Sequence, residues 1–533
     1  MNRYRWATPG DVNAFFGLML DNVADLVLMV SLLQTTFEVP ATFSIRYMVP
    51  GTALGVLVGD LAFTWMAFRL AQRTGRNNVT AMPLGLDTPS TFGMVFFVVG
   101  PAFLAGKDRG LSPDEAAHYA WQIGMCSIVL SGVFKLICAV GSGWIRRIAP
   151  RAGLLGSLTA IALVLISFLP LLEILHTPMV GIVSLVVVLT TLTARVALPG
   201  RIPGALGGLL IGGAIYYALQ AAGWLPPHDA PFEPSLGLTL PIPTLAWTAV
   251  VGDALHYLPV VIPFALATVV GGIDCTESAA AAGDDFDTTR VIAVEGVATL
   301  IAGCCGGVIQ TTPYIGHPAY KAMGGRAAYT LATAIFIGGA GFFGYFGHLY
   351  AVIPLPAIFP VLIFVGLEIT AQSFHATPNR HYPAVALACV PAMAYLVMLF
   401  VDPLLAVTGI DVAGLPESLA GQLETLRVLS GGFIVTSLLW ASALVAVLER
   451  RLAAAGGVMA LAAGCSLLGL IHSPLPGGSM VNPWELLWQP ALPAHHTLLT
   501  LAAGYAIAAI VLVAWSRWPT AAPAAVNDDG TLE

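Results

Sequence analysis

Leu266-Ala-Thr-Val-Val-Gly-Gly-Ile273 is an apolar run that continues directly into Asp274 and Glu277, before any surface loop has begun. Farther along, Glu295 lies inside a second apolar segment, and Gln310-Thr-Thr-Pro-Tyr-Ile-Gly-His-Pro-Ala-Tyr320 interrupts a third. Carboxylates inside apolar sequence of membrane length are costly, so they usually face the protein interior or a water-filled cavity. This part of the chain is therefore the first candidate for a functional site.

The composition excludes an ordinary soluble domain. Hydrophobic residues make up 57% of the 533 residues and charged residues 10%, against roughly 25% charged residues in soluble domains, and the mean hydropathy is +0.84. Such a chain is a polytopic membrane protein, with the lipid bilayer as a partner and no role in nucleic-acid binding. The seven cysteines show neither a disulfide framework nor the spacing of metal ligands, so we expect no metal and no cofactor.

Apolar segments long enough to span a bilayer follow one another along the chain, separated by short breaks of Gly, Pro and charged residues. Seven precede a Pro-rich loop at 224–243, seven follow it, and about two more end the chain. The first span is retained rather than cleaved as a signal peptide, because Asp21, Asn22 and Asp25 lie within it. We therefore expect an all-α fold.

The Lys and Arg residues fall mainly on one side of this segmentation, as the positive-inside rule requires when the N-terminus is cytoplasmic. Lys135 lies within a span, and the basic residues on the outer side are Arg46, Lys107, Arg109 and Arg427. The bias predicts a multi-pass protein of the inner (plasma) membrane with both termini in the cytoplasm.

An internal repeat relates the two sets of seven segments. The second segment carries Asp60 and the ninth carries Glu295. Each is followed by a segment that opens with a break, Gly85-Leu-Asp-Thr-Pro-Ser90 in span 3 and Tyr314-Ile-Gly-His-Pro-Ala319 in span 10. A polar residue before Pro suits a helix start, so both spans should be a short extended piece leading into a half-helix. Because seven is odd, the repeat is inverted, which indicates a secondary transporter with its site at the midplane.

Asp274 and Glu277 are three residues apart and share one face if the helix continues through them. One of them would hold an N–H donor of the substrate, and Glu277 is a candidate to carry or relay a proton. The alternative is that the helix ends early and that Asp274 begins a cytoplasmic loop.

The two breaks supply further substrate-binding candidates. Thr312 and Tyr314 lie in the second extended piece with His317 at the cap of its half-helix, and Asp87 and Thr88 occupy the symmetric position in the first half. Two facing helix N-termini would offer N–H donors and positive dipole ends to an electron-rich ligand. His317 could also couple protons near neutral pH. For His317 and Asp87, the alternative is a structural cap.

Polar residues of the other spans complete the set of candidates. Asn22 could line the same cavity and bind substrate, and Asp25 and Glu295 are further candidates for proton coupling. Alternatively these side chains, with Asp60, make polar contacts between helices, and Lys135 pairs with one of the acids.

The second half of the chain contains three motifs that occur in a fixed order. They are Glu295-Gly-Val-Ala-Thr-Leu-Ile-Ala-Gly-Cys-Cys-Gly-Gly, Thr311-Thr-Pro-Tyr-Ile-Gly-His and Gly324-Gly-Arg-Ala-Ala-Tyr-Thr330. Their order and spacing resemble the nucleobase/ascorbate transporter (xanthine/uracil permease) family, nearest its hypoxanthine, guanine and adenine permease branch. The resemblance implies a core domain that moves against a gate domain, with proton symport. By motif position Asp274 matches the span-eight Asp of that branch, whereas Gly316 and Gly271 stand where purine-type and uracil-type members carry a Glu.

The resemblance also implies the domain boundaries. We expect the core domain at 1–150 (spans 1–4) and 246–348 (spans 8–11), the gate domain at 151–245 (spans 5–7) and 349–452 (spans 12–14), and two extra spans with a polar tail at 453–533. The extra spans could serve as a homodimer contact or as packing for the gate.

We predict a secondary active transporter for proton-coupled uptake of a purine-like nucleobase or related small heterocycle by elevator-type alternating access. The alternative within the same fold is an anion transporter of the sulfate, bicarbonate or organic-anion type. An enzyme is not expected, because the sequence lacks the Gly-x-Gly-Asp, His-Glu-x-x-His and Gly-x-Ser-Gly motifs of intramembrane proteases. The expected partners are the small-molecule substrate, the coupling proton and the bilayer.

Overall fold

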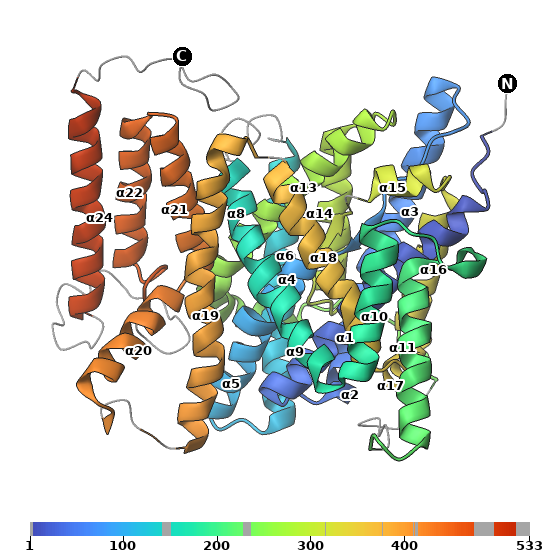
Figure 1. Cartoon of the computed structure of the whole chain (residues 1–533), viewed down its shortest axis with the longest axis horizontal. Coiled ribbons are helices and arrows are strands. Elements are labelled where there is room, and N and C mark those ends of the chain that lie inside the picture. The colour runs from blue at the N-terminus through green and yellow to red at the C-terminus, as the bar shows by residue number, and fades with distance from the viewer. Residues whose placement is uncertain are drawn as a thin grey trace. The chain divides into compact units, whose positions relative to one another are not determined.

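The computed structural model describes residues 4–140, 151–226, 236–314, 316–375, 377–408, 410, 414–473 and 495–518. Helices account for nearly all of the secondary structure in these residues, and the sheet found there has two short strands (Figure 1). Ten of the described helices are long and apolar enough to cross a membrane, or up to twelve if each of two bent pairs is one span. The prediction of an all-α polytopic membrane protein is confirmed.

The chain forms two compact units, Met1–Ala149 with Ser157–Ala376 and Pro150–Gly156 with Thr377–Glu533. The first unit holds both breaks. The helices and strand of the first repeat are α1 (Gly10–Phe37), α2 (Ala41–Phe43), α3 (Val49–Thr74), β1 (Leu84–Leu86), α4 (Thr88–Met94), α5 (Gly100–Asp108), α6 (Pro113–Val140), α8 (Arg151–Ile161), α9 (Phe168–His176), α10 (Pro178–Val188) and α11 (Gly204–Ala221). Short π-helical or 3-10 turns connect several of them: η1 (Ser44–Met48), η2 (Val95–Val99), η3 (Ala162–Ser167), η4 (Leu189–Thr193) and η5 (Pro199–Arg201).

The second repeat follows the same order of elements. Its part within the first unit consists of η6 (Ala246–Val250), α12 (Val251–Ala254), η7 (Leu255–Tyr257), α13 (Leu258–Ala281), α14 (Thr288–Cys304), β2 (Thr311–Pro313), α15 (His317–Ala322), α16 (Ala328–Phe342), α17 (Phe346–Val352) and α18 (Leu355–His375). Helix α14 packs against α6 and α3, and α16 packs against α3 and α1. A strand followed by a helix therefore appears at the corresponding position of each half, as the inverted repeat predicts.

Local sequence signals set the ends of several of these helices. Gly75 ends α3 with a φ of 67°, a left-handed conformation that glycine adopts without strain. The carboxylates of Asp87 and Asp287 cap α4 and α14, because they accept from the backbone N–H groups of Ser90 at 3.0 Å and Arg290 at 2.8 Å. This is the usual role of Asp before a first helical turn, and the expected cap of the first half-helix is confirmed.

Three elements differ from the sequence-based expectation. The eleventh span, the last one expected within 246–348, is broken near Gly344, and α16 and α17 meet there at 92°. The second half-helix, α15, has only six residues, because the glycines that follow it, including Gly324 with a φ of 87°, leave the helical conformation. Helix α20 (Glu417–Ser430), which the apolar segments do not predict, is bent by 76° from α21 (Phe433–Leu448).

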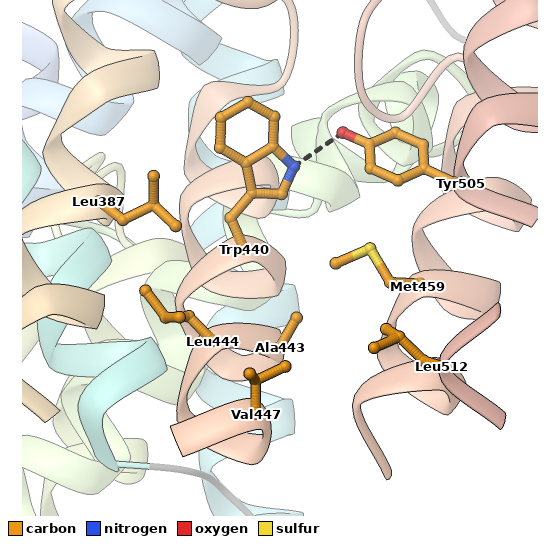
Figure 2. Close-up of a pocket in the computed structure, with 8 residues that line it drawn as sticks. All are labelled: Leu387, Trp440, Ala443, Leu444, Val447, Met459, Tyr505 and Leu512. Carbon is orange, nitrogen blue, oxygen red and sulfur yellow. Dashed lines mark hydrogen bonds between the residues drawn. The ribbon is translucent and has the colours of Figure 1, made fainter. Parts of the chain in front are cut away.

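The second unit contains α19 (Tyr382–Thr408), α20, α21, α22 (Leu452–Leu467) and α24 (His495–Ser516), with η8 (Asn379–His381) before α19. Helix α22 packs along α24 and α21. An apolar cavity of about 370 Å³ lies among these helices, and Trp440 Nε1 donates to the hydroxyl of Tyr505 at 2.7 Å beside it (Figure 2). Its lining contains no charged side chain, so this cavity does not suit a polar solute.

Candidate functional site

The centre of the first unit is the pairing of the two breaks. Strands β1 and β2 are antiparallel, with Gly85 opposite Thr312. Beyond the strands, the backbone N–H of Asp87 donates to Gln310 O at 3.1 Å and that of Tyr314 donates to Pro83 O at 2.9 Å. Irregular backbone at membrane depth is tolerated only where protein or a watery cavity satisfies its polar groups. Here some of the backbone N–H and C=O groups of each break hydrogen-bond to the other break.

On the other side of β1, side chains of α1 and α3 accept hydrogen bonds from its backbone N–H groups. The carboxylate of Asp60 accepts from Leu84 N and the amide oxygen of Asn22 accepts from Leu86 N, both at 3.0 Å. The hydroxyl of Thr88 donates to Asp25 at 3.0 Å. Asn22, Asp25 and Asp60 are fully buried, so the structure gives these three residues a bracing role along β1 and at the start of α4.

An ion pair braces β2 in the same way. Lys135 Nζ of α6 lies 2.8 Å from Glu295 Oε1 of α14, and both side chains have 0% exposure. The same ammonium donates to Thr311 O at 2.9 Å, and Thr299 contacts Thr311 through its hydroxyl at 3.1 Å. The expectation that Lys135 pairs with one of the buried acids is confirmed, and the partner is Glu295. The pair fixes the position of the second break.

Helix α13 runs unbroken through both of its predicted carboxylates, so the alternative that it ends before Asp274 is wrong. One of its faces packs on β2, where the thiol of Cys275 contacts Pro313 O at 3.3 Å. Asp274 and Glu277 lie off this face and are half-buried. On their side of the helix, a Cβ added at Gly271 would meet no described atom within 4 Å. This side of α13 therefore borders open space.

Tyr314 occupies the region where the family resemblance places a substrate-binding Glu. A Cβ added at Gly316 would lie 2.6 Å from Tyr314 Cε1, so a larger residue there would collide with the ring. Thr312 and Tyr314 are both half-buried. The glycine at 316 thus has a physical reason, since it makes room for the tyrosine.

His317 lies in a different environment from the one predicted. Gly316 stands at the cap of α15 and His317 is the first helical residue, so the expected cap at His317 is wrong. The imidazole is buried, with Nε2 3.3 Å from Asp284 Oδ2 and 3.2 Å from Thr80 O. Its neighbours there belong to the loops that follow α3 and α13.

Asp284 is the centre of that buried ion cluster. Its carboxylate lies 2.5 Å from Lys321 Nζ and 3.1 Å from Arg76, and it accepts from Thr80 N at 2.9 Å. Burial raises the pKa of Asp284, but hydrogen bonds from His317, Lys321 and Thr80 outweigh it, and the pKa lies below its usual value. The cluster joins the loops that follow α3 and α13 to helix α15, which gives His317 a structural partner in this conformation.

The structure therefore divides the predicted residues into three groups. Asn22, Asp25, Asp87, Thr88 and Glu295 surround the paired breaks; Asp274, Glu277, Thr312 and Tyr314 are half-buried; and His317 belongs to the Asp284 cluster. In the described residues, no group of three or more His, Cys, Asp and Glu could hold a metal ion.

Sequence reasoning missed several polar contacts of the site. Gln310 accepts from the Ser131 hydroxyl at 2.7 Å and approaches Asp87 at 3.5 Å. Asp21 is buried, and its Oδ2 would lie 3.8 Å from a Cβ at Gly85. The sequence held a signal for both residues, because Gln310 comes directly before the second predicted break and Asp21 lies inside the first span.

No protein-family model matches the sequence, and no curated protein matches it. Among solved structures, the chain is similar to the transmembrane domain of a cyanobacterium bicarbonate transporter, BicA, with a TM-score of 0.46 and 14% identity over 73% of this chain and 96% of that one. It is also similar to SLC26A9 (TM-score 0.49, 11% identity, 73% and 62% of the chains) and to the murine Slc26a9 anion transporter in the inward-facing state (0.45, 14%, 75% and 66%). The chain spans slightly less than two thirds of these two SLC26A9 chains. At these values the similarities assign neither a family nor a substrate.

Proposed function

We propose that the protein is a secondary active transporter that moves a small polar solute by alternating access. The support is the pair of breaks, because discontinuous helices at corresponding positions of inverted repeats form the solute site of such transporters. The bracing of β1 and β2 by buried polar side chains on both sides keeps such a break intact. The solute site we propose is the space that borders β2 and the open side of α13.

We infer the class of solute from the charges that surround the site. Five carboxylates are buried around the paired breaks, and the one buried ammonium found among the described residues, Lys135, is already paired with Glu295. The five are Asp21, Asp25, Asp60, Asp87 and Glu295. A site surrounded by hydrogen-bond acceptors and lacking a free cation favours a solute that brings N–H donors. A purine-like heterocycle has this chemistry.

The half-buried residues next to this space also carry oxygen atoms that can accept hydrogen bonds. Asp274 and Glu277 present carboxylates on α13, and Thr312 and Tyr314 present their side chains from the second break. In the proposal Asp274 accepts from an N–H of the solute and Tyr314 lies beside its ring, in the space that a Glu at position 316 would need. Aromatic side chains pack well against planar rings.

Proton coupling follows from the same excess of acids. When one of several desolvated carboxylates binds a proton, the electrostatic repulsion among them decreases. We propose that the transported proton is carried by Glu277, the half-buried acid one helical turn from Asp274. Asp25 and Glu295 are engaged with Thr88 and Lys135, so they fit a supporting role.

An anion transporter is the alternative that this charge balance disfavours. The start of the helix at Thr88 would attract an anion through its dipole, but the carboxylate of Asp87 already occupies that position and accepts from Ser90 N. A bicarbonate or sulfate ion would meet negative charge there.

Purified protein screened for thermal stabilisation separates the two solute classes. We expect adenine, guanine or hypoxanthine to raise the unfolding temperature and chloride, bicarbonate or sulfate to leave it unchanged; stabilisation by the anions alone would reject the proposal. Asp274→Asn should lower uptake of the stabilising base about 10- to 100-fold, since a hydrogen bond to a charged group contributes about 1.5–3 kcal/mol. Glu277→Gln should abolish the dependence of uptake on the proton gradient. Glu173→Gln, at a half-buried glutamate of α9, is the matched control and should transport as the wild type does.

A further inference from the structure

A cleft of about 270 Å³ opens where α3 ends and α14 begins, away from the paired breaks. One wall is the last two turns of α3, and the other is the loop before α14 with its first turn. The residues that matter in its lining are Trp65, Arg69, Arg73, Asp285, Asp287 and Arg290. The cleft therefore combines three guanidinium groups with two carboxylates and an indole ring.

The three guanidinium groups of the cleft are available to a ligand. Arg69, Arg73 and Arg290 are exposed, and among the described residues none of them forms an ion pair, whereas Arg76, one turn beyond Arg73, pairs with Asp284. Asp287 is already used, because it caps α14 at the backbone of Arg290. With Asp285 included, the charged groups of the cleft sum to one positive charge.

The outer face of α3 changes from apolar to basic toward this cleft. Leu61, Trp65, Arg69 and Arg73 are four residues apart and share one face of the helix. Leu61 is 41% exposed and Trp65 is 54% exposed, and the guanidinium of Arg69 lies 5.1 Å from the centre of the Trp65 ring. Val297, 41% exposed on α14, adds apolar surface on the neighbouring helix. Trp is typical of the membrane–water boundary, so the arginines stand at headgroup level.

We propose that this cleft binds the headgroup phosphate of an anionic phospholipid of the phosphatidylglycerol type. The guanidinium group of arginine can donate to two phosphate oxygens at once. Basic pockets at the ends of membrane helices bind anionic headgroups. The single excess positive charge matches one phosphodiester, and one acyl chain lies along Leu61, Trp65 and Val297. A phosphatidylethanolamine would leave the excess charge in place. This site is separate from the proposed solute site.

Native mass spectrometry of the detergent-purified full chain tests the proposal, with palmitoyl-oleoyl phosphatidylglycerol and the ethanolamine lipid of the same chains titrated separately. We expect tighter binding of the glycerol lipid and about fivefold weaker binding for each guanidinium removed in Arg69→Gln and Arg73→Gln. Arg46→Gln is the matched control, because Arg46 is an equally exposed arginine 5.5 Å from the ring of Tyr47. It should bind the lipid as the wild type does.

Several outcomes would overturn the proposal. Equal affinity for the two lipids would remove the anionic specificity, and an equal loss in Arg46→Gln would make the effect one of general surface charge. Competition by millimolar inorganic phosphate that fully displaces the lipid would show that the cleft takes free phosphate. Arg290→Gln provides a second variant on the other wall. If the α3 variants unfold at a lower temperature than the wild type, unchanged lipid affinity in Arg290→Gln rejects the site.

Discussion

Replacement of Lys135 by Met tests how the second break is held in place. The ammonium lies 2.8 Å from Glu295, both side chains have 0% exposure, and the same group donates to Thr311 O of β2 at 2.9 Å. Removal of one partner of a buried pair leaves a buried charge without compensation and costs about 3–5 kcal/mol. We expect Lys135→Met to lower the free energy of unfolding of the solubilised protein at pH 7 by that amount, as measured by titration with SDS in mixed micelles.

The double variant Lys135→Met, Glu295→Gln identifies the cause. It removes both charges, and pairs replaced together by neutral groups are often close to wild type in stability, so it should recover more than half of the loss. The cost of the single variant should also shrink at low pH, because a protonated Glu295 has no charge to compensate. Thr299→Val removes a 3.4 Å contact to the ammonium and the contacts of the hydroxyl with Thr311, but it leaves both charges in place. It is the control and should cost about 1–3 kcal/mol, less than Lys135→Met. A double variant no more stable than the single one would refute the reasoning.

The remaining predictions concern the ion cluster and the packing of glycines. Asp284→Asn should cost about 3 kcal/mol at pH 7. Because the pKa of Asp284 is below its usual value, its contribution is complete at neutral pH and is lost as pH falls below about 4, so the gap between variant and wild type should close there in thermal unfolding curves. Gly51→Ala would drive a Cβ into the backbone of Gly307 and should lower stability by about 1–3 kcal/mol or more. Gly271→Ala, in open space within α13, is its control and should keep or slightly raise the unfolding temperature, because Ala favours the helix by about 0.5–1 kcal/mol; equal losses in the two would contradict the packing argument.

Much of the membrane fold was predictable from local chemistry. The apolar segments identify the helices because a bilayer accepts only segments that satisfy their own backbone hydrogen bonds. Asp87 before Pro89 predicts a helix start, and the structure has the cap at that residue. The pairing of β1 with β2 was also within reach, since two breaks at corresponding positions of an inverted repeat meet at the midplane. The bend at Gly344 was not, because nothing in a glycine-rich apolar run specifies its direction.

The site was predictable as a set of residue types, but their roles were not. Charge within apolar sequence pointed to Asp25, Glu295 and His317, yet that pattern is the same for a group that binds solute and a group that braces a neighbouring strand. The structure pairs Glu295 with Lys135 and His317 with Asp284. These partners lie far apart along the chain, and their contacts depend on how helices pack.

The sequence by itself determined that the chain spans a membrane, where most of its spanning helices run and that spans 3 and 10 are broken, because each of these depends on residues close together in the chain. Only the tertiary structure decided where each polar side chain lies and which of them bind the backbone of the two breaks. Asp274 and Glu277 are half-buried on the side of α13 that borders open space, while the Asp60 carboxylate and the Asn22 amide oxygen accept from N–H groups of β1. A buried polar group is stable only with a partner, and the identity of that partner is set by packing in three dimensions.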